Sequence, residues 1–146
     1  MRALLIAPVG TVTDLDLPET AARSEIRDHV GSAGAVDQGR YHPHALLHLH
    51  GDGQGIGLDG NLTAWALASA WRGMPLYPFH GPVVVTGRTQ DGETSALDDD
   101  LAAHVHAVAQ TVRETWVAWQ TRPPASSEAA MRELLAYVAR DVTANR

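Results

Sequence analysis

The sequence predicts an α+β fold, in which a small mixed sheet of about five short strands with two helices is followed by a C-terminal αα-hairpin. Two observations lead to this prediction. All 13 glycines of the 146-residue chain and six of its eight prolines precede residue 98, in a part where short apolar runs alternate with turns. The remainder is rich in alanine and repeats apolar residues every three or four positions, as amphipathic helices do. We therefore expect two domains, residues 1–97 and residues 98–146.

The chain is predicted to open with two strands and a helix. Residues 2–8 are apolar enough for a strand buried on both faces, and residues 11–17 alternate as a half-exposed strand does. Pro18 suits the first turn of a helix, where the N–H that proline lacks has no intrahelical partner. The helix repeats apolar residues every four positions and ends at Gly31. Its stripe consists of Ala22, Ile26 and Val30.

Residues 32–60 are predicted to be extended segments joined by glycine turns. The clearest strand covers residues 45–50, and the Gly-Asp-Gly that follows it has the chemistry of a hairpin turn. We expect a short return strand over residues 56–58. Gly53 and Gly60 are expected in turns with positive φ, a conformation that most other residues adopt only under strain.

A second helix is expected over residues 62–72. Asn61 can cap it, because its side-chain oxygen can accept from free N–H groups of the first turn. Gly73 ends the helix, and the apolar run at residues 82–87 predicts one more strand. The apolar face of the helix consists of Leu62, Trp65, Ala66 and Ala70.

The C-terminal part predicts two amphipathic helices. The aspartates at 98–100 suit a helix start, since carboxylates accept from its free N–H groups and complement its dipole. Pro123 and Pro124 break the pattern, and Ser126 or Ser127 caps the second helix. The first apolar stripe is Leu101, Val105, Val108, Val112, Trp116 and Trp119, and the second is Met131, Leu134, Leu135, Val138 and Val142.

These two stripes have to be buried, because so many exposed apolar side chains would cause aggregation. The two helices expected within residues 1–97 already compete for the sheet. We therefore expect the hairpins of two chains to pack together in a homodimer, in preference to a hairpin that folds back on its own chain. The residues expected at such an interface are Val105, Val112, Trp116, Trp119, Leu134 and Val138.

Four short segments of residues 1–97 share their pattern with a known family. They are Met1–Ile6 with Pro8, then Val30-Gly31, then the strand and Asp-Gly turn that lead to Leu58, Asn61 and Ala64, and finally Gly81–Gly87. In these segments the chain resembles the DUF3846 domain family, which comprises small uncharacterised proteins of actinobacteria, phages and plasmids. The resemblance implies a small α+β module from a mobile element and carries over no catalytic residue. The chain departs from the family in lacking a second glycine after Gly31 and in having a helical tail.

Four of the eight histidines fall within residues 42–50. Residues two apart on a strand lie on one face, about 7 Å apart, so His48 and His50 could converge on a zinc ion with a further ligand from a neighbouring strand. The candidate metal ligands in this segment are His44, His48 and His50, and either His80 or Asp52 could complete the site. We favour the alternative, a solvated histidine face on a strand whose Ala45, Leu47 and Leu49 enter the core.

Two further patterns are interpreted structurally. Residues 55–60 match G-x-G-x-x-G, but a dinucleotide site also requires an acidic residue about 20 positions on, and position 80 is histidine. The glycines are therefore assigned to tight turns. His104 and His106 lie two apart on a predicted helix, so they point in different directions and cannot ligate one metal ion together. We expect both side chains to be solvated.

Composition excludes several classes of protein. The chain has no cysteine. It therefore has no disulfide, no thiol nucleophile and no cysteine-ligated zinc or iron–sulfur centre. The net charge of −6 disfavours nucleic-acid binding, and no local basic cluster appears along the sequence. No apolar run reaches the roughly 18 residues of a membrane span. We expect a cytoplasmic protein without cofactor and without nucleic-acid or membrane partners.

No catalytic constellation emerges from these residues, since none of the serines lies in a G-x-S-x-G nucleophile elbow. We expect a non-enzymatic interaction or regulatory protein of a phage, plasmid or integrated element that binds a host or element protein. Two alternatives remain. One is a metal-binding protein or metal-dependent hydrolase that uses the cluster His42–His50, and the other is a small-ligand or nucleotide-binding module.

Overall fold

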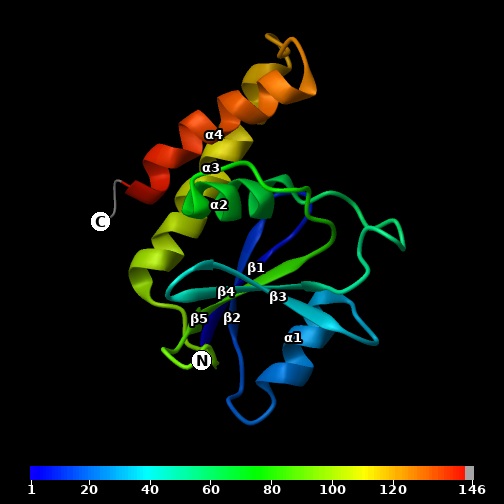
Figure 1. Cartoon of the computed structure of the whole chain (residues 1–146), viewed down its shortest axis with the longest axis vertical. Coiled ribbons are helices and arrows are strands. Elements are labelled where there is room, and N and C mark those ends of the chain that lie inside the picture. Colours follow the sequence, from blue (N-terminus) through cyan, green and yellow to red (C-terminus); the bar gives the residue numbers. More distant parts are fainter. Residues whose placement is uncertain (144–146) are drawn as a thin grey trace.

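The computed structural model describes residues 1–143, which form an antiparallel sheet and four helices (Figure 1). The strands are β1 (Arg2–Ile6), β2 (Val12–Asp16), β3 (Val36–His42), β4 (Ala45–His50), β5 (Val83–Arg88) and β6 (Thr94–Ser95). They follow the order β2-β1-β5-β4-β3, and β6 pairs with β5. The helices are α1 (Ala22–Val30), α2 (Leu62–Arg72), α3 (Asp99–Trp119) and α4 (Ser127–Thr143). The predicted α+β class with a C-terminal helix pair is confirmed.

Helices cover both faces of the sheet. Figure 1 shows α1 on one side and α2, α3 and α4 on the other. Side chains alternate across a strand, and β5 divides accordingly. Val83 and Val85 join the core beneath α2, whereas Val84 joins the smaller core beneath α1. The apolar run of this strand therefore reflects burial on both faces.

The first helix is shorter than predicted. Ala22, Ile26 and Val30 are buried as expected, and Gly31 ends α1 in a left-handed conformation with φ 75°. However, α1 begins at Ala22 and not at Pro18. The N–H of Leu17 still bonds the Met1 carbonyl at 2.8 Å, which extends the pairing of β2 beyond its last residue. Residues 18–21 are consequently used to turn the chain towards the helix.

The predicted hairpin after β4 is wrong. The partner of β4 is the preceding strand β3, with Val36 opposite His50, and residues 56–58 form no strand. The reason is that β5 occupies the other edge of β4, which leaves no edge for a return strand. Gly53 and Gly60 do not have positive φ either. Gly53 instead permits close approach, because a Cβ there would lie 2.8 Å from the carbonyl oxygen of His80.

The helix α2 occupies the predicted residues but is buried more completely than its predicted face implied. The Asn61 side chain caps it as expected, since Oδ1 accepts from the N–H of Ala64 at 3.0 Å. All of residues 63–69 are buried. An amphipathic stripe would cover one side only. This helix lies between the sheet and the pair α3 and α4, so both of its sides are covered.

The C-terminal hairpin folds back on its own chain. Asp98 caps α3 by accepting from the N–H of Leu101 at 2.8 Å, and Ser126 caps α4 by accepting from the N–H of Ala129 at 3.0 Å. Four expected interface residues are buried within this chain, in the core beneath and beside α2: Val105, Val112, Leu134 and Val138. The hairpin therefore does not need a dimer to bury most of its stripes.

Two large side chains of the stripes remain at the surface. Trp116 is 57% exposed and Met131 is 36% exposed. Trp119 is half-buried against the core.

Within residues 1–143, no helix combines the length and the hydropathy needed to cross a bilayer.

The position of the hairpin predicts the cost of truncating its side chains. Leu134→Ala removes a fully buried side chain and should lower the free energy of unfolding by about 2–5 kcal/mol. Val117→Ala is the matched control on α3, and because Val117 is 68% exposed it should change stability by less than about 0.5 kcal/mol. Urea unfolding of the full chain measures both. Equal midpoints would show that α4 does not pack as described.

Candidate functional site

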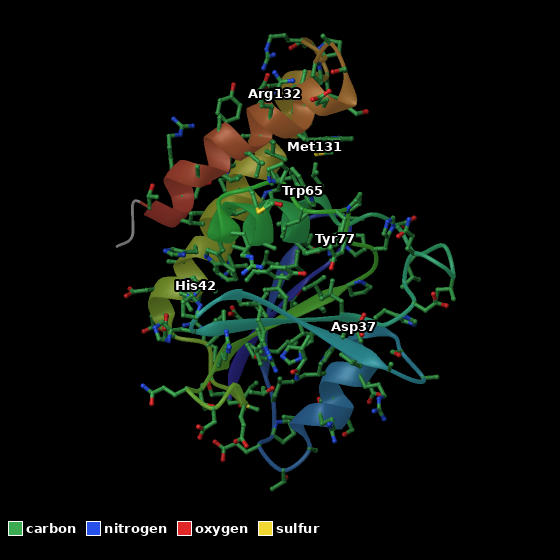
Figure 2. All side chains as sticks on the ribbon, viewed as in Figure 1. Asp37, His42, Trp65, Tyr77, Met131 and Arg132 are labelled. Atoms are coloured by element: carbon green, nitrogen blue, oxygen red, sulfur yellow. The ribbon has the colours of Figure 1, made fainter. Side chains whose placement is uncertain are left out.

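A groove of about 1020 Å³ opens beside the tip of the helical hairpin. We call it the hairpin groove. It lies between the N-terminal turn of α2 with the segment 75–79 and the meeting ends of α3 and α4. In Figure 2, Met131 and Arg132 on α4 lie above Trp65 on α2. Its apolar lining consists of Leu62, Trp65, Pro75, Leu76, Pro78, Phe79, Trp116, Trp119, Pro124, Ala130, Met131 and Leu135.

The lower wall of the groove is held by Trp65. Its indole Nε1 donates to the carbonyl of Leu76 at 2.7 Å, and the N–H of Leu76 donates to Ser69 Oγ at 3.2 Å. Farther along the segment, the rings of Tyr77 and Phe79 meet edge to face with centroids 6.0 Å apart. The segment after α2 is therefore fixed to the helix at several points.

The upper wall is held by a polar cluster at the hairpin tip. Trp119 Nε1 donates to Glu133 at 2.9 Å, and Arg122 donates to both oxygens of the same carboxylate at 3.1 and 2.8 Å. The hydrogen bonds from Arg122 and Trp119 lower the pKa of Glu133. Trp116 lies against Trp119, with ring centroids 6.3 Å apart. The indole of Trp119 is therefore held by a hydrogen bond, whereas the indole of Trp116 is exposed to solvent.

The lining of the groove is better suited to binding an apolar ligand than to catalysis. Of the described residues that line it, only Glu128 and Arg132 are charged, and their nearest N and O atoms are 4.0 Å apart at the rim. No histidine is among the lining residues. A pocket of apolar and aromatic side chains with a polar rim is the usual form of a binding surface.

The candidate metal ligands do not come together as a group. His44 is exposed in the turn between β3 and β4, and His48 is buried. His50 and His80 line a second, polar groove of about 630 Å³ together with Asp52. There, His50 Nδ1 accepts from the N–H of Asp52 at 2.9 Å, and His80 Nδ1 lies 3.1 Å from the carbonyl oxygen of Leu58. Within residues 1–143, no three or more histidine and acidic side chains are arranged to hold a metal ion.

The expectation of a solvated histidine face is wrong for His48. This side chain is 2% exposed, because α1 covers the face of β4 from which it projects. Its Nε2 lies 2.9 Å from Thr86 Oγ1, and the Thr86 hydroxyl donates to the Gly87 carbonyl at 3.1 Å. The threonine oxygen therefore accepts from an Nε2–H of neutral His48. Burial lowers the pKa of His48 to about 4.

The helical histidines differ from one another. They face different directions as predicted, and His106 is exposed, but the expectation of a solvated His104 is wrong. His104 is 6% exposed, and its Nδ1 accepts from the indole N–H of Trp71 at 3.2 Å. α2 packs against this side of α3, which the periodicity of α3 alone does not reveal.

The glycine-rich segment 55–60 lies between β4 and α2, but the N-terminus of α2 is already occupied. Besides capping Ala64, the Asn61 side chain donates to the carbonyls of Ile6 and Gly81, each at 3.0 Å. Asn61 is only 1% exposed, so the cap position of the helix is filled by the chain's own side chain.

No family model, curated protein or solved structure matches this chain. The resemblance to the DUF3846 family therefore stays a prediction, and function has to be inferred from the geometry of the sites.

Burial of neutral His48 predicts a pH dependence of stability. The pKa is about 4 in the folded state and about 6.5 in the unfolded state, so the unfolded chain binds more protons between these values. The stabilising contribution is complete above about pH 6.5 and is lost as the pH falls towards 4, at a cost of about 3 kcal/mol.

His48→Gln removes this titration and retains an N–H donor for Thr86. The free energy of unfolding, measured by urea at a series of pH values, should fall less steeply in this variant than in the wild type. His106→Gln, at the exposed histidine of α3, should follow the wild type. Parallel curves for all three proteins would contradict the assignment of a buried neutral imidazole.

Proposed function

We propose that this chain is a non-enzymatic binding protein whose hairpin groove holds the apolar face of a short helix from a partner protein. The observation that supports this most is the exposure of Trp116 within an apolar groove. This tryptophan is 57% exposed, although the four preceding residues of its stripe, Leu101, Val105, Val108 and Val112, are buried. Tryptophan is among the residues most enriched where binding energy concentrates.

A helical occupant follows from the way the helices frame the groove. On α4, Glu128, Met131, Arg132 and Leu135 line it, and this spacing of three and four is one continuous helix face. Residues 127–135 extend for about 12 Å, or about two helical turns. An amphipathic helix that lies beside this face would use its own residues at the same spacing, as in other helix-in-groove complexes.

The class of partner follows from the resemblance described in the sequence analysis. If the chain comes from a phage, plasmid or integrated element, its partner is a protein of the host or of that element. A second copy of the chain is the competing occupant of the same groove, since Trp116 and Met131 are exposed and Trp119 is only half-buried.

A library of displayed amphipathic helical peptides provides the test. The wild-type chain should enrich peptides with apolar residues at positions i, i+3, i+4 and i+7. Met131→Asp and Trp116→Ser should weaken their binding by at least about tenfold, because each removes apolar surface from the groove. Val117→Ser is the matched control, since Val117 is exposed on the same turn of α3 but does not line the groove.

Two results would contradict the proposal. One is enrichment of the same peptides by the wild type and by Met131→Asp. The other is a wild-type mass of twice 15.6 kDa in sedimentation that Met131→Asp returns to one chain, because the groove would then be covered by a second copy.

A further inference from the structure

Three arginines meet in a pocket of about 300 Å³ at the opposite end of α2 from the hairpin groove. Arg72 comes from the last turn of α2, Arg40 from β3 and Arg88 from the end of β5. We call this the arginine pocket. Its other lining residues are Tyr41, His42, Pro43, Thr89 and Gln90. Three of the 11 basic residues of an acidic chain thus converge on one small hollow.

Two of the three guanidinium groups contact a neighbour on another segment. Arg88 Nη1 donates to the carbonyl of His42 at 3.3 Å. The guanidinium carbon of Arg72 lies 5.9 Å from the centre of the Tyr41 ring, within the range of a cation–π contact. Arg40 extends towards the turn after β5, where a Cβ on Gly92 would lie 4.0 Å from its Nη2.

None of these arginines is neutralised within residues 1–143. No acidic residue lines the pocket, and no carboxylate of the described chain forms an ion pair with Arg40, Arg72 or Arg88. By contrast, Arg2, Arg122 and Arg132 each have a carboxylate within 4.0 Å. Arg88 Nε is buried without a hydrogen-bond partner in the described part of the chain. Like charges that line one small pocket repel one another, and a bound anion would relieve this repulsion.

We propose that the arginine pocket binds the phosphate group of a small molecule. Guanidinium groups match the oxygens of phosphate in geometry and charge, and three of them favour an ion with two charges over a single carboxylate. Thr89 supplies a further donor, because its Oγ1 already accepts from the N–H of Glu93 at 3.0 Å and its hydroxyl hydrogen can point elsewhere. A volume of about 300 Å³ accommodates a phosphate group with a small substituent.

The net charge of the chain selects among sources of phosphate. At −6, the protein as a whole repels a nucleic acid, whose binding depends on many phosphate contacts. One small pocket can still hold one phosphate group. The same group occurs on inorganic phosphate and on small phosphate monoesters, and both are therefore used as probes.

The test is a titration of the full chain followed by amide chemical shifts in solution. Inorganic phosphate, glycerol phosphate and acetate are added separately at constant ionic strength, because screening weakens such contacts. We expect saturable shifts at residues 40–43 and 88–92 with at least one of the two phosphates. Binding of that phosphate should be at least about tenfold tighter than that of acetate. A phosphate ester that binds more tightly than the inorganic ion would identify a site for a phosphorylated small molecule, and the reverse would identify a site for the free ion.

Arginine variants link the binding to this pocket. Arg40→Gln and Arg72→Gln alter exposed side chains and should each weaken phosphate binding by at least about fivefold while the chain stays folded. Arg23→Gln, an exposed arginine on α1, is the matched control and should bind like the wild type. Met131→Asp in the hairpin groove should also leave phosphate binding unchanged, so that this inference and the proposed function can fail separately.

Several results would overturn the inference. They are the absence of saturable shifts with either phosphate, equal affinity for acetate, shifts that lie outside the pocket, and an equal loss of binding in Arg23→Gln. Tighter binding of a single-stranded oligonucleotide than of either small phosphate would also overturn it, since the pocket would then form part of a nucleic-acid surface.

Discussion

The side chain of Asn61 joins three segments that are distant in the sequence. Its oxygen caps the first turn of α2, and its amide group donates to the carbonyl of Ile6 at the end of β1 and to that of Gly81 just before β5. The backbone N–H of Asn61 also donates to the carbonyl of Phe79 at 2.8 Å. The three side-chain bonds are buried, where a missing partner costs much more than at the surface. They tie the start of α2 to the end of β1 and to the segment before β5, and the hairpin packs on α2.

Because α2 is enclosed on both sides, it acts as a rigid support for the two surfaces of interest. Its first turn and Trp65 form part of the hairpin groove, and Arg72 in its last turn reaches the arginine pocket. The two surfaces differ in chemistry. One is apolar with a polar rim, and the other is polar with unneutralised guanidinium groups. Binding residues held on a fixed element lose less conformational entropy when they engage a ligand than residues on a mobile loop do.

Apart from the start of α1, local signals in the sequence determined the helix ends and the apolar stripes. The caps at Asn61, Asp98 and Ser126, and the stripe of α1, depend on residues within a few positions of one another. Such short-range chemistry is readable from the chain itself. The same holds for β4 and β5, whose apolar runs are long enough to identify a strand.

Only the tertiary structure decided what covers each face. Strand periodicity places His48 and Leu47 on opposite faces of β4. The packing of α1 is what buries His48, and this burial lowers its pKa to about 4. The stripe of α3 likewise does not reveal that Val112 enters the core while Trp116, one turn later, stays exposed. Arg40, Arg72 and Arg88 are separated by 32 and 16 positions, so their meeting depends on the order of the strands and on the direction of α2. Periodicity determines which residues share a face, whereas the long-range packing of elements decides whether that face meets protein or solvent.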